Sequence, residues 1–128
     1  MSENINNSEV KAIKDAIMKF YHEGHVKANP ALYEKILYDG WKFFLHDENG
    51  NLRIVDKNEY YSWYDPENVN KDLIWKTQFE YVDVTDKIGS AKIIIGNQNV
   101  EYTDYFNLMK LEGKWWIVHK ISVTNRTV

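Results

Sequence analysis

Asp104 and His119, near the end of the chain, are the two residues best suited to move a proton together. They lie in two runs rich in aromatic and apolar residues, 102–111 and 114–123, which flank Glu112-Gly113. A two-residue loop between such runs predicts a β-hairpin. In a hairpin of regular register, Asp104 and His119 are diagonal neighbours on one face.

The regular register places Phe106 opposite His119 and leaves the rest of that face apolar. The face consists of Asp104, Phe106, Leu108, Trp115, Ile117, His119 and Ile121. Diagonal neighbours lie ~7–8 Å apart, within reach of long or aromatic side chains, and a carboxylate beside an imidazole suits a general base. Two other interpretations stay open. Asp104 could accept hydrogen bonds from backbone or tyrosine groups while His119 is a core residue, or a bulged turn could separate the pair.

Aromatic rings are frequent in this chain, which contains five Trp, nine Tyr and five Phe. So many large, rigid side chains in a small protein favour a cavity for a flat or apolar ligand, or a packed oligomer face. Plain core packing is the alternative for each ring. The candidate ligand-binding residues are Tyr21, Trp41, Phe43, Trp63, Trp75, Phe79 and Tyr102.

A metal site is not expected. His22 and His25 are three residues apart, which could bring both to one face of a helix, but the pattern offers no third ligand. Histidines near a helix C-terminus also suit the helix dipole. The sequence contains no cysteine, so disulfides and thiolate sites are excluded. Nothing resembles a phosphate-binding loop or a nucleophile elbow, and no cofactor is expected.

The length and charge of the chain narrow the class of protein. Its 128 residues carry a formal net charge of −3, with acidic and basic residues interspersed. We expect one domain over 1–128, with 1–8 as a flexible N-terminus. The lack of a basic stripe argues against nucleic-acid binding, and the short apolar runs argue against a membrane span. No signal-peptide core follows the polar first residues, so we expect a cytoplasmic protein.

Helical patterns fill the first part of the sequence. Ser8 as N-cap and Gly24 as stop predict a first helix over about 9–23. Asn29-Pro30 predicts the start of a second helix, because proline suits the first helical position. We expect this second helix to end at Gly40.

Strand patterns fill most of the remainder. Runs 41–46 and 52–55 flank an Asn-Gly turn, and Asp56 with Glu59 resembles a capping box for a third helix over about 57–64. Further strands are predicted over 73–84, 91–95 and the terminal hairpin. Helices followed by strands with short turns indicate an α+β architecture, with helices on one face of a mostly antiparallel sheet.

Four segments together carry a family resemblance. They are Phe20-Tyr21-His22-Glu23-Gly24, the Trp41–Val55 hairpin, Tyr102-Thr-Asp-Tyr-Phe106 and Gly113-Lys-Trp-Trp-Ile-Val-His-Lys120. In this order they resemble the nuclear transport factor 2-like superfamily (SnoaL-like, ketosteroid-isomerase-like), in particular its small bacterial branch labelled "putative lumazine-binding". The resemblance implies a cone-shaped, strongly curved sheet wrapped around three N-terminal helices, with a cavity inside. It also implies a homodimer formed through the outer face of the sheet.

The resemblance suggests two further site residues. Asp47 looks like the catalytic base of ketosteroid-isomerase-like relatives, and Asn107 lies near the position of their oxyanion-side acid, where an amide could donate a hydrogen bond. Asp47-Glu-Asn-Gly50 is also an ordinary turn sequence. Where relatives often carry His-Pro, this chain has Tyr38-Asp39-Gly40, so no role of that histidine is transferred.

These observations favour one function and leave two alternatives. We expect a protein that binds an unidentified small apolar or aromatic molecule in the cavity of the cone. The first alternative is an isomerase or dehydratase that uses an Asp/His acid–base pair. The second is a dimeric protein-interaction module that buries Tyr105, Met109 and Trp116 against a partner.

Overall fold

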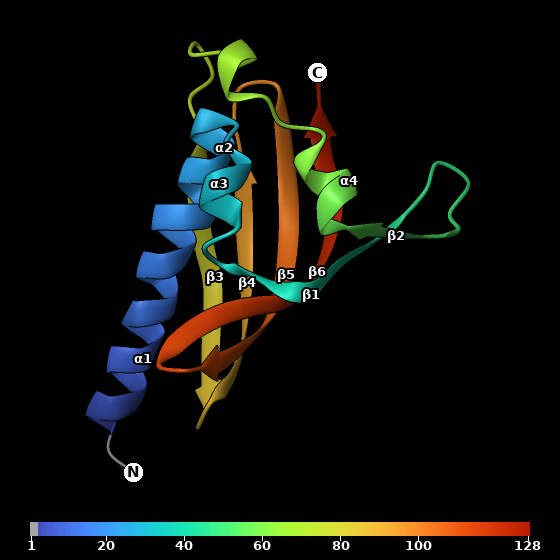
Figure 1. The fold of residues 1–128 in the computed structure, drawn as a ribbon. Helices are drawn as coiled ribbons and strands as arrows, with labels where there is room; N and C mark the ends of the chain where they lie inside the picture. The colour runs from blue at the N-terminus through green and yellow to red at the C-terminus, as the bar shows by residue number, and fades with distance from the viewer. Residues whose placement is uncertain (1–2) are drawn as a thin grey trace.

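The first part of the chain forms a helical layer. In the computed structural model, which describes residues 3–128, α1 (Glu3–Ala16), a π-helical segment (Ile17–His22) and α2 (Glu23–Lys27) follow one another without a break. α3 (Pro30–Tyr33) packs beside α2, and α1 runs alongside the edge strand of the sheet (Figure 1). The layer therefore covers one face of the sheet, as the α+β prediction requires.

The first helix differs from the prediction at both ends. Ser8 is not its N-cap, because α1 begins at Glu3. The expected flexible N-terminus lies outside the described residues at positions 1 and 2, and residues 3–8 are helical. Gly24 is not a stop, because the helix continues to Lys27 and ends before Ala28, which has a φ of 47°.

The two shorter helices begin as predicted. The Asn29 side chain accepts a hydrogen bond from the Ala31 amide at 3.0 Å and thereby caps α3. α3 is shorter than expected and does not reach Gly40. Asp56 accepts a hydrogen bond from the Glu59 amide at 2.9 Å and caps α4 (Lys57–Tyr61).

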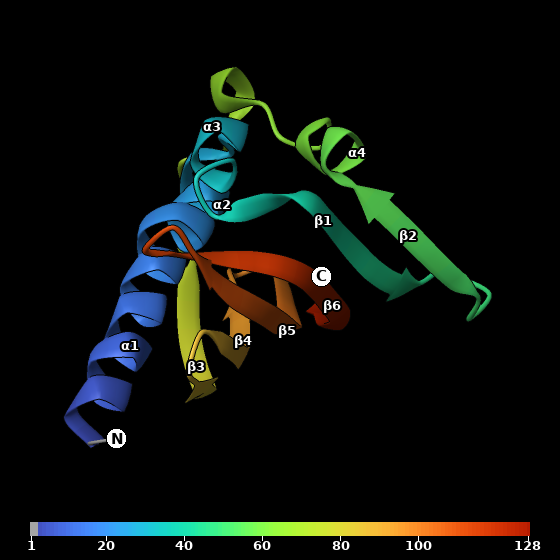
Figure 2. The same ribbon diagram turned by 60° about the horizontal axis from the view of Figure 1, so that its bottom comes forward.

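Six strands form one open sheet. They are β1 (Leu37–His46), β2 (Leu52–Asp56), β3 (Lys76–Thr85), β4 (Ile88–Gly96), β5 (Val100–Leu111) and β6 (Lys114–Thr127). Their order is β2-β1-β6-β5-β4-β3, and every pair is antiparallel except β1 with β6. Figure 2 shows the β1–β2 arm turning away from the other strands, which gives the sheet its strong bend. The cone-shaped, mostly antiparallel fold is confirmed.

The terminal hairpin has the predicted two-residue loop. Glu112 and Gly113 have φ values of 53° and 77°, the left-handed pair that a tight hairpin turn requires. The inner face of the sheet packs against the helical layer to form one hydrophobic core. Its largest members include Ile13, Ile17, Trp41, Ile93, Ile95, Phe106 and Leu108. None of the described helices is long and apolar enough to cross a membrane.

Candidate functional site

A β-bulge in β6 decides which side chains enter the interior. Leu108 pairs with Ile117, as the regular register predicts, but the next pair is Asn107 with His119. Val118 therefore has no opposite residue on β5. An extra residue of this kind changes the alternation of side chains between the two faces of the sheet.

The bulge separates the predicted acid–base pair. His119 is exposed on the outer face, where its ring lies 5.7 Å from that of Phe44. Lys120 takes the inner position opposite Phe106, and Asp104 also lies inside with 1% of its surface exposed. The predicted common face for Asp104 and His119 is therefore wrong, because the register of β6 shifts by one residue between Ile117 and His119.

Asp104 is held by a tyrosine from the π-helical segment. The hydroxyl of Tyr21 donates a hydrogen bond of 2.6 Å to Oδ2 of Asp104. The second oxygen, Oδ1, is buried and has no hydrogen-bond partner within residues 3–128. Such a buried free acceptor carries a desolvation cost of about 1–3 kcal/mol, and it is a place where a further donor stabilises the structure.

Lys120 is a second charged group in the interior, and 4% of its surface is exposed. Its Nζ atom lies 4.2 Å from the ring centre of Phe43, 4.7 Å from that of Tyr60 and 5.2 Å from that of Tyr21. The same atom donates a long hydrogen bond of 3.3 Å to the hydroxyl of Tyr60. The ammonium is thus surrounded by ring faces, which attract cations.

His25 belongs to the same interior network. Its Nδ1 lies 2.9 Å from the carbonyl oxygen of Tyr21 and 2.9 Å from the hydroxyl of Tyr33. The rings of Trp75 and Tyr64 pack edge-on against its imidazole at 5.0 and 5.8 Å. Nδ1 of His25 is therefore held by groups from the helical layer, and its ring is packed between side chains of the 62–75 loop.

A cavity of about 150 Å³ adjoins Lys120. Its walls are chiefly the rings of Phe43, Tyr60, Trp63, Tyr64 and Tyr102. Polar groups come from His25, Lys120, Ser122 and Thr124. An apolar cavity of about 150 Å³ in another protein holds benzene, so a single ring is the size of ligand that fits here.

Burial shifts the pKa of each titratable group in this interior. Desolvation, and secondarily the nearby charge of Lys120, lowers the pKa of His25 to about 4. Desolvation raises the pKa of Tyr64 to about 12 and that of Tyr60 well above its usual value. Desolvation also lowers the pKa of Lys120, and the nearby charge of Asp104 opposes this shift. Around neutral pH, the imidazole and the phenols are therefore uncharged hydrogen-bonding groups.

Three of the predicted ligand-binding rings line the cavity, namely Phe43, Trp63 and Tyr102. Tyr21 and Trp41 are fully buried core residues, and Trp75 packs on His25 instead. Phe79 lies on β3 near the ammonium of Lys14, outside the cavity wall.

The two residues suggested by ketosteroid-isomerase-like relatives lie away from this cavity. Oδ1 of Asp47 accepts hydrogen bonds of 2.9 Å from the amides of Asn49 and Asn51, so Asp47 shapes the β1–β2 turn. Asn107 is exposed on the outer face and shares a shallow groove with His119. The structure brings neither residue to Asp104.

The histidine pair does not form a metal site. Nδ1 of His22 lies 2.8 Å from the hydroxyl oxygen of Thr77, whereas His25 contacts Tyr33. Within residues 3–128, no cluster of three His, Asp or Glu side chains could hold a metal ion.

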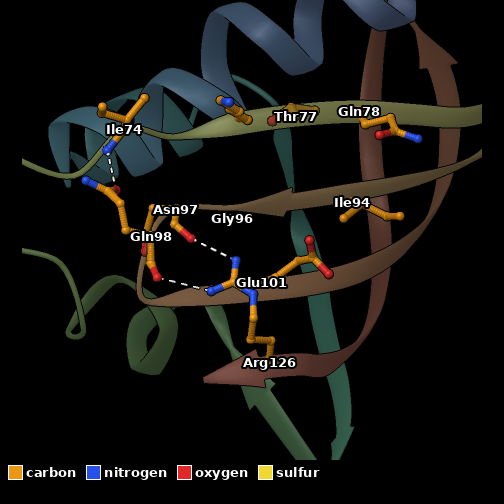
Figure 3. Close-up of a pocket in the computed structure, with 10 residues that line it drawn as sticks. Ile74, Thr77, Gln78, Ile94, Gly96, Asn97, Gln98, Glu101 and Arg126 are labelled. Atoms are coloured by element: carbon orange, nitrogen blue, oxygen red, sulfur yellow. Dashed lines mark hydrogen bonds between the residues drawn. The ribbon is translucent and has the colours of Figure 1, made fainter. Parts of the chain in front are cut away.

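A larger hollow, of about 570 Å³, lies on the outer face beside the 97–99 turn (Figure 3). Its main polar side chains already have partners. Arg126 donates to the carbonyl oxygens of Asn97 and Gln98, and the Gln98 side chain accepts from the Ile74 amide at 2.8 Å. These contacts stabilise the turn. The smaller interior cavity, beside the incompletely satisfied Lys120, is the better candidate for a specific ligand.

Sequence reasoning missed Lys120, Tyr60 and Tyr64. For the tyrosines a signal was present, because their i, i+4 spacing places both on one side of the chain after the Asp56 cap. For Lys120 the sequence contained no such signal. The sequence Ile117-Val-His-Lys120 fits a regular strand as well as a bulged one.

Comparisons with known proteins agree with this architecture. The family described as "Putative lumazine-binding" matches residues 8–121. An ntf2-like protein of unknown function from Shewanella baltica is 27% identical, with a TM-score of 0.82 over 94% of this chain and 96% of that one. None of the curated proteins matches the chain.

Two more distant structures show the breadth of the fold. An NTF-2-like protein of unknown function from Silicibacter pomeroyi is 15% identical, with a TM-score of 0.82 over 98% of this chain and 100% of that one. A "Putative Scytalone Dehydratase" from Novosphingobium aromaticivorans is 11% identical, with a TM-score of 0.76 over 99% of this chain and 91% of that one. At these identities the likeness shows the fold alone. The family match over residues 8–121, with the 27% identical ntf2-like structure beside it, establishes that the chain belongs to the "Putative lumazine-binding" family of the nuclear transport factor 2-like superfamily.

Proposed function

We propose that this protein binds a small, flat molecule of about one ring in the interior cavity of the cone. The observation that carries the proposal is the wall itself, in which five aromatic rings surround a space of about 150 Å³ beside a buried lysine. Ligand sites are typically concave and mostly apolar, with a few polar groups that fix orientation. This cavity has that composition.

Benzamide is a suitable neutral probe, because it has one ring and one polar group. A ligand that binds the folded state alone raises the apparent stability, by about 2.7 kcal/mol at a concentration of 100 times Kd. We expect millimolar benzamide to raise the melting temperature of the wild-type protein. No rise would contradict the proposal.

A cavity-filling variant locates the effect. Ser122 lines the cavity, so Ser122→Phe should fill the space and remove the response to benzamide. Ser90→Phe adds the same ring on the outer face of β4 and should keep the response. Near-UV circular dichroism of both variants shows whether they fold. If folded Ser122→Phe responded like the wild type, the probe would bind elsewhere.

A proton-transfer enzyme is the second candidate. It is favoured by the free Oδ1 of Asp104, a buried acceptor beside the phenol of Tyr21. We place this function second because Asp104 is not among the residues that line the cavity. Acetophenone in D₂O provides a test, since a carboxylate base removes a methyl proton, forms the enolate and returns a deuteron. An enzyme would exchange these protons and Asp104→Asn would not, whereas equal rates for both proteins would exclude Asp104 as the base.

We propose that the protein pairs with a second copy through the outer face of the sheet. A single row of paired residues crosses that face from one edge to the other: Ile54, Phe44, Ile121, Tyr105, Lys92 and Tyr81. Lys92 is the one charged member, and its Nζ lies 5.3 Å from the ring centre of Tyr105. A row that is apolar or aromatic apart from Lys92, on an exposed sheet, supports burial against a partner.

A further inference from the structure

We infer that Lys120 recognises the ligand of the cavity and that this ligand is a small aromatic acid, whose carboxylate accepts hydrogen bonds from the lysine ammonium. The inference rests on the proposed function, since it names the class of molecule that the cavity binds. Four features of the interior carry it: the position of Lys120, its incomplete hydrogen bonding, the charge of the cavity wall and the shape of that wall.

The position of Lys120 is set by the backbone. The bulge at Val118 turns His119 outward and Lys120 inward, so the lysine enters the interior from a paired position on a central strand. It pairs with Phe106 on one side and with Phe43 of β1 on the other. A side chain anchored between two strands is held more firmly than one on a loop, which suits ligand recognition.

The ammonium of Lys120 is incompletely satisfied. A protonated lysine has three N–H donors, and within residues 3–128 its Nζ makes one hydrogen bond, of 3.3 Å, to Tyr60. The rings of Phe43 and Tyr60 attract the charge but accept no strong hydrogen bond. Because a buried charge is costly unless it is paired, a carboxylate at this place would stabilise the site.

The charge of the cavity wall favours an anion. Lys120 is the one lysine in the wall, which contains no arginine, aspartate or glutamate. His25 adds no charge around neutral pH, because burial lowers its pKa to about 4. The negative charge of Asp104 lies behind the wall, where Tyr21 binds it. Ser122, which also lines the cavity, carries a hydroxyl that can donate a hydrogen bond to a carboxylate.

The shape of the wall favours an aromatic acid over an aliphatic one. Rings of Tyr64 and Tyr102 line the space together with Trp63, and flat ligands stack on such surfaces. The volume of about 150 Å³ limits the ligand to about one ring with its carboxylate.

Benzoate and benzamide test this inference, because the two molecules have nearly the same size and differ in charge. By calorimetric titration we expect the wild-type protein to bind benzoate at least about tenfold more tightly than benzamide, as a charge-assisted hydrogen bond provides. Lys120→Met keeps an unbranched side chain that is one atom shorter and removes the charge. It should lose the preference for benzoate and bind benzamide within about threefold of the wild type.

The outcomes separate the two proposals. Equal affinities of the wild type for benzoate and benzamide would overturn the role of Lys120 and leave the cavity as a binding site. Binding of neither probe would overturn the proposed function as well. Should Lys120→Met fail to fold, the ε-CH₂ signal of Lys120 in the wild-type NMR spectrum answers the same question. Benzoate should shift that signal more than benzamide does, and an unmoved signal would contradict the inference.

Discussion

The two oxygens of the Asp104 carboxylate are in different situations. Oδ2 accepts the hydroxyl of Tyr21 at 2.6 Å, whereas Oδ1 is buried without a partner within the described chain. Tyr21→Phe removes the one donor and leaves both oxygens buried and free. We expect a loss of unfolding free energy of about 1–3 kcal/mol, measured by urea titration.

Tyr105→Phe, on the exposed outer face, is the matched control and should change stability little. Equal stabilities of the two variants would show that the Tyr21–Asp104 bond does not stabilise the fold.

His25 gives the protein a pH-dependent stability. Burial lowers its pKa in the folded state to about 4, compared with about 6.5 for an unfolded chain. The unfolded state therefore binds more protons between these values, and stability falls as the pH drops from 6.5 towards 4. The contribution that is lost amounts to about 3 kcal/mol.

His25→Gln should flatten this dependence. Urea titrations at several pH values between 7 and 4 would measure the slope of stability against pH, and the variant should lack the part due to His25. His119→Gln changes an exposed histidine and should keep the wild-type slope. A wild-type slope in His25→Gln would assign the pH dependence to other groups.

The candidate site was only partly predictable from its residues. Alternation along β5 correctly grouped Asp104 with Phe106 and Leu108 on one face, and the tyrosine partner of Asp104 was one of the interpretations left open. The direction of Lys120 did not follow, because it depends on one extra residue in β6 whose sequence carries no bulge signal. Phe43, Trp63 and Tyr102 line the cavity, but Tyr21 and Trp41 have equally aromatic side chains and lie in the core.

At the scale of elements, the approach of α3 to α2 depends on Gly24. A Cβ atom at this position would lie 2.4 Å from Cε1 of Tyr33, which is too close for the two elements to keep their distance. Gly24 therefore serves packing in the middle of a helix, although glycine usually signals a helix end. This explains why the predicted stop at Gly24 is wrong.

Gly24→Ala tests that explanation. In an exposed helix, glycine to alanine raises the free energy of unfolding by about 1 kcal/mol. Here the ring of Tyr33 must move, so we expect the free energy of unfolding to fall by about 1–3 kcal/mol in urea titrations. Gly40→Ala is the control, because a Cβ at Gly40 meets nothing within 4 Å. If Gly24→Ala were as stable as Gly40→Ala, the close contact with Tyr33 would not explain the glycine.

The elements that local signals define were predicted well. The caps at Asn29 and Asp56 and the turn at Glu112-Gly113 appear where their side chains or φ angles require. The element boundaries that tertiary packing sets were not predicted. The parallel pairing of β1 with β6 joins segments far apart in the chain, and no short-range pattern encodes it.

At the scale of the whole molecule, the outer row of the sheet predicts a dimer. Tyr105 and Ile121 lie at its centre and are 43% and 55% exposed in the single chain. Light scattering coupled to size-exclusion chromatography should give the mass of two chains for the wild type and of one chain for Tyr105→Glu. Ala31→Glu adds the same charge to exposed α3 and should leave the dimer intact. A monomeric wild type would contradict the dimer.

The anomalous scattering of bromine can show whether a ligand binds in the interior of the cone. Crystals of the wild-type protein soaked in 4-bromobenzoate should show a bromine peak among the rings of Tyr60, Tyr64 and Tyr102, with the carboxylate at the ammonium of Lys120. A peak confined to the outer hollow beside Arg126, or no ordered bromine, would contradict a ligand site in the cone.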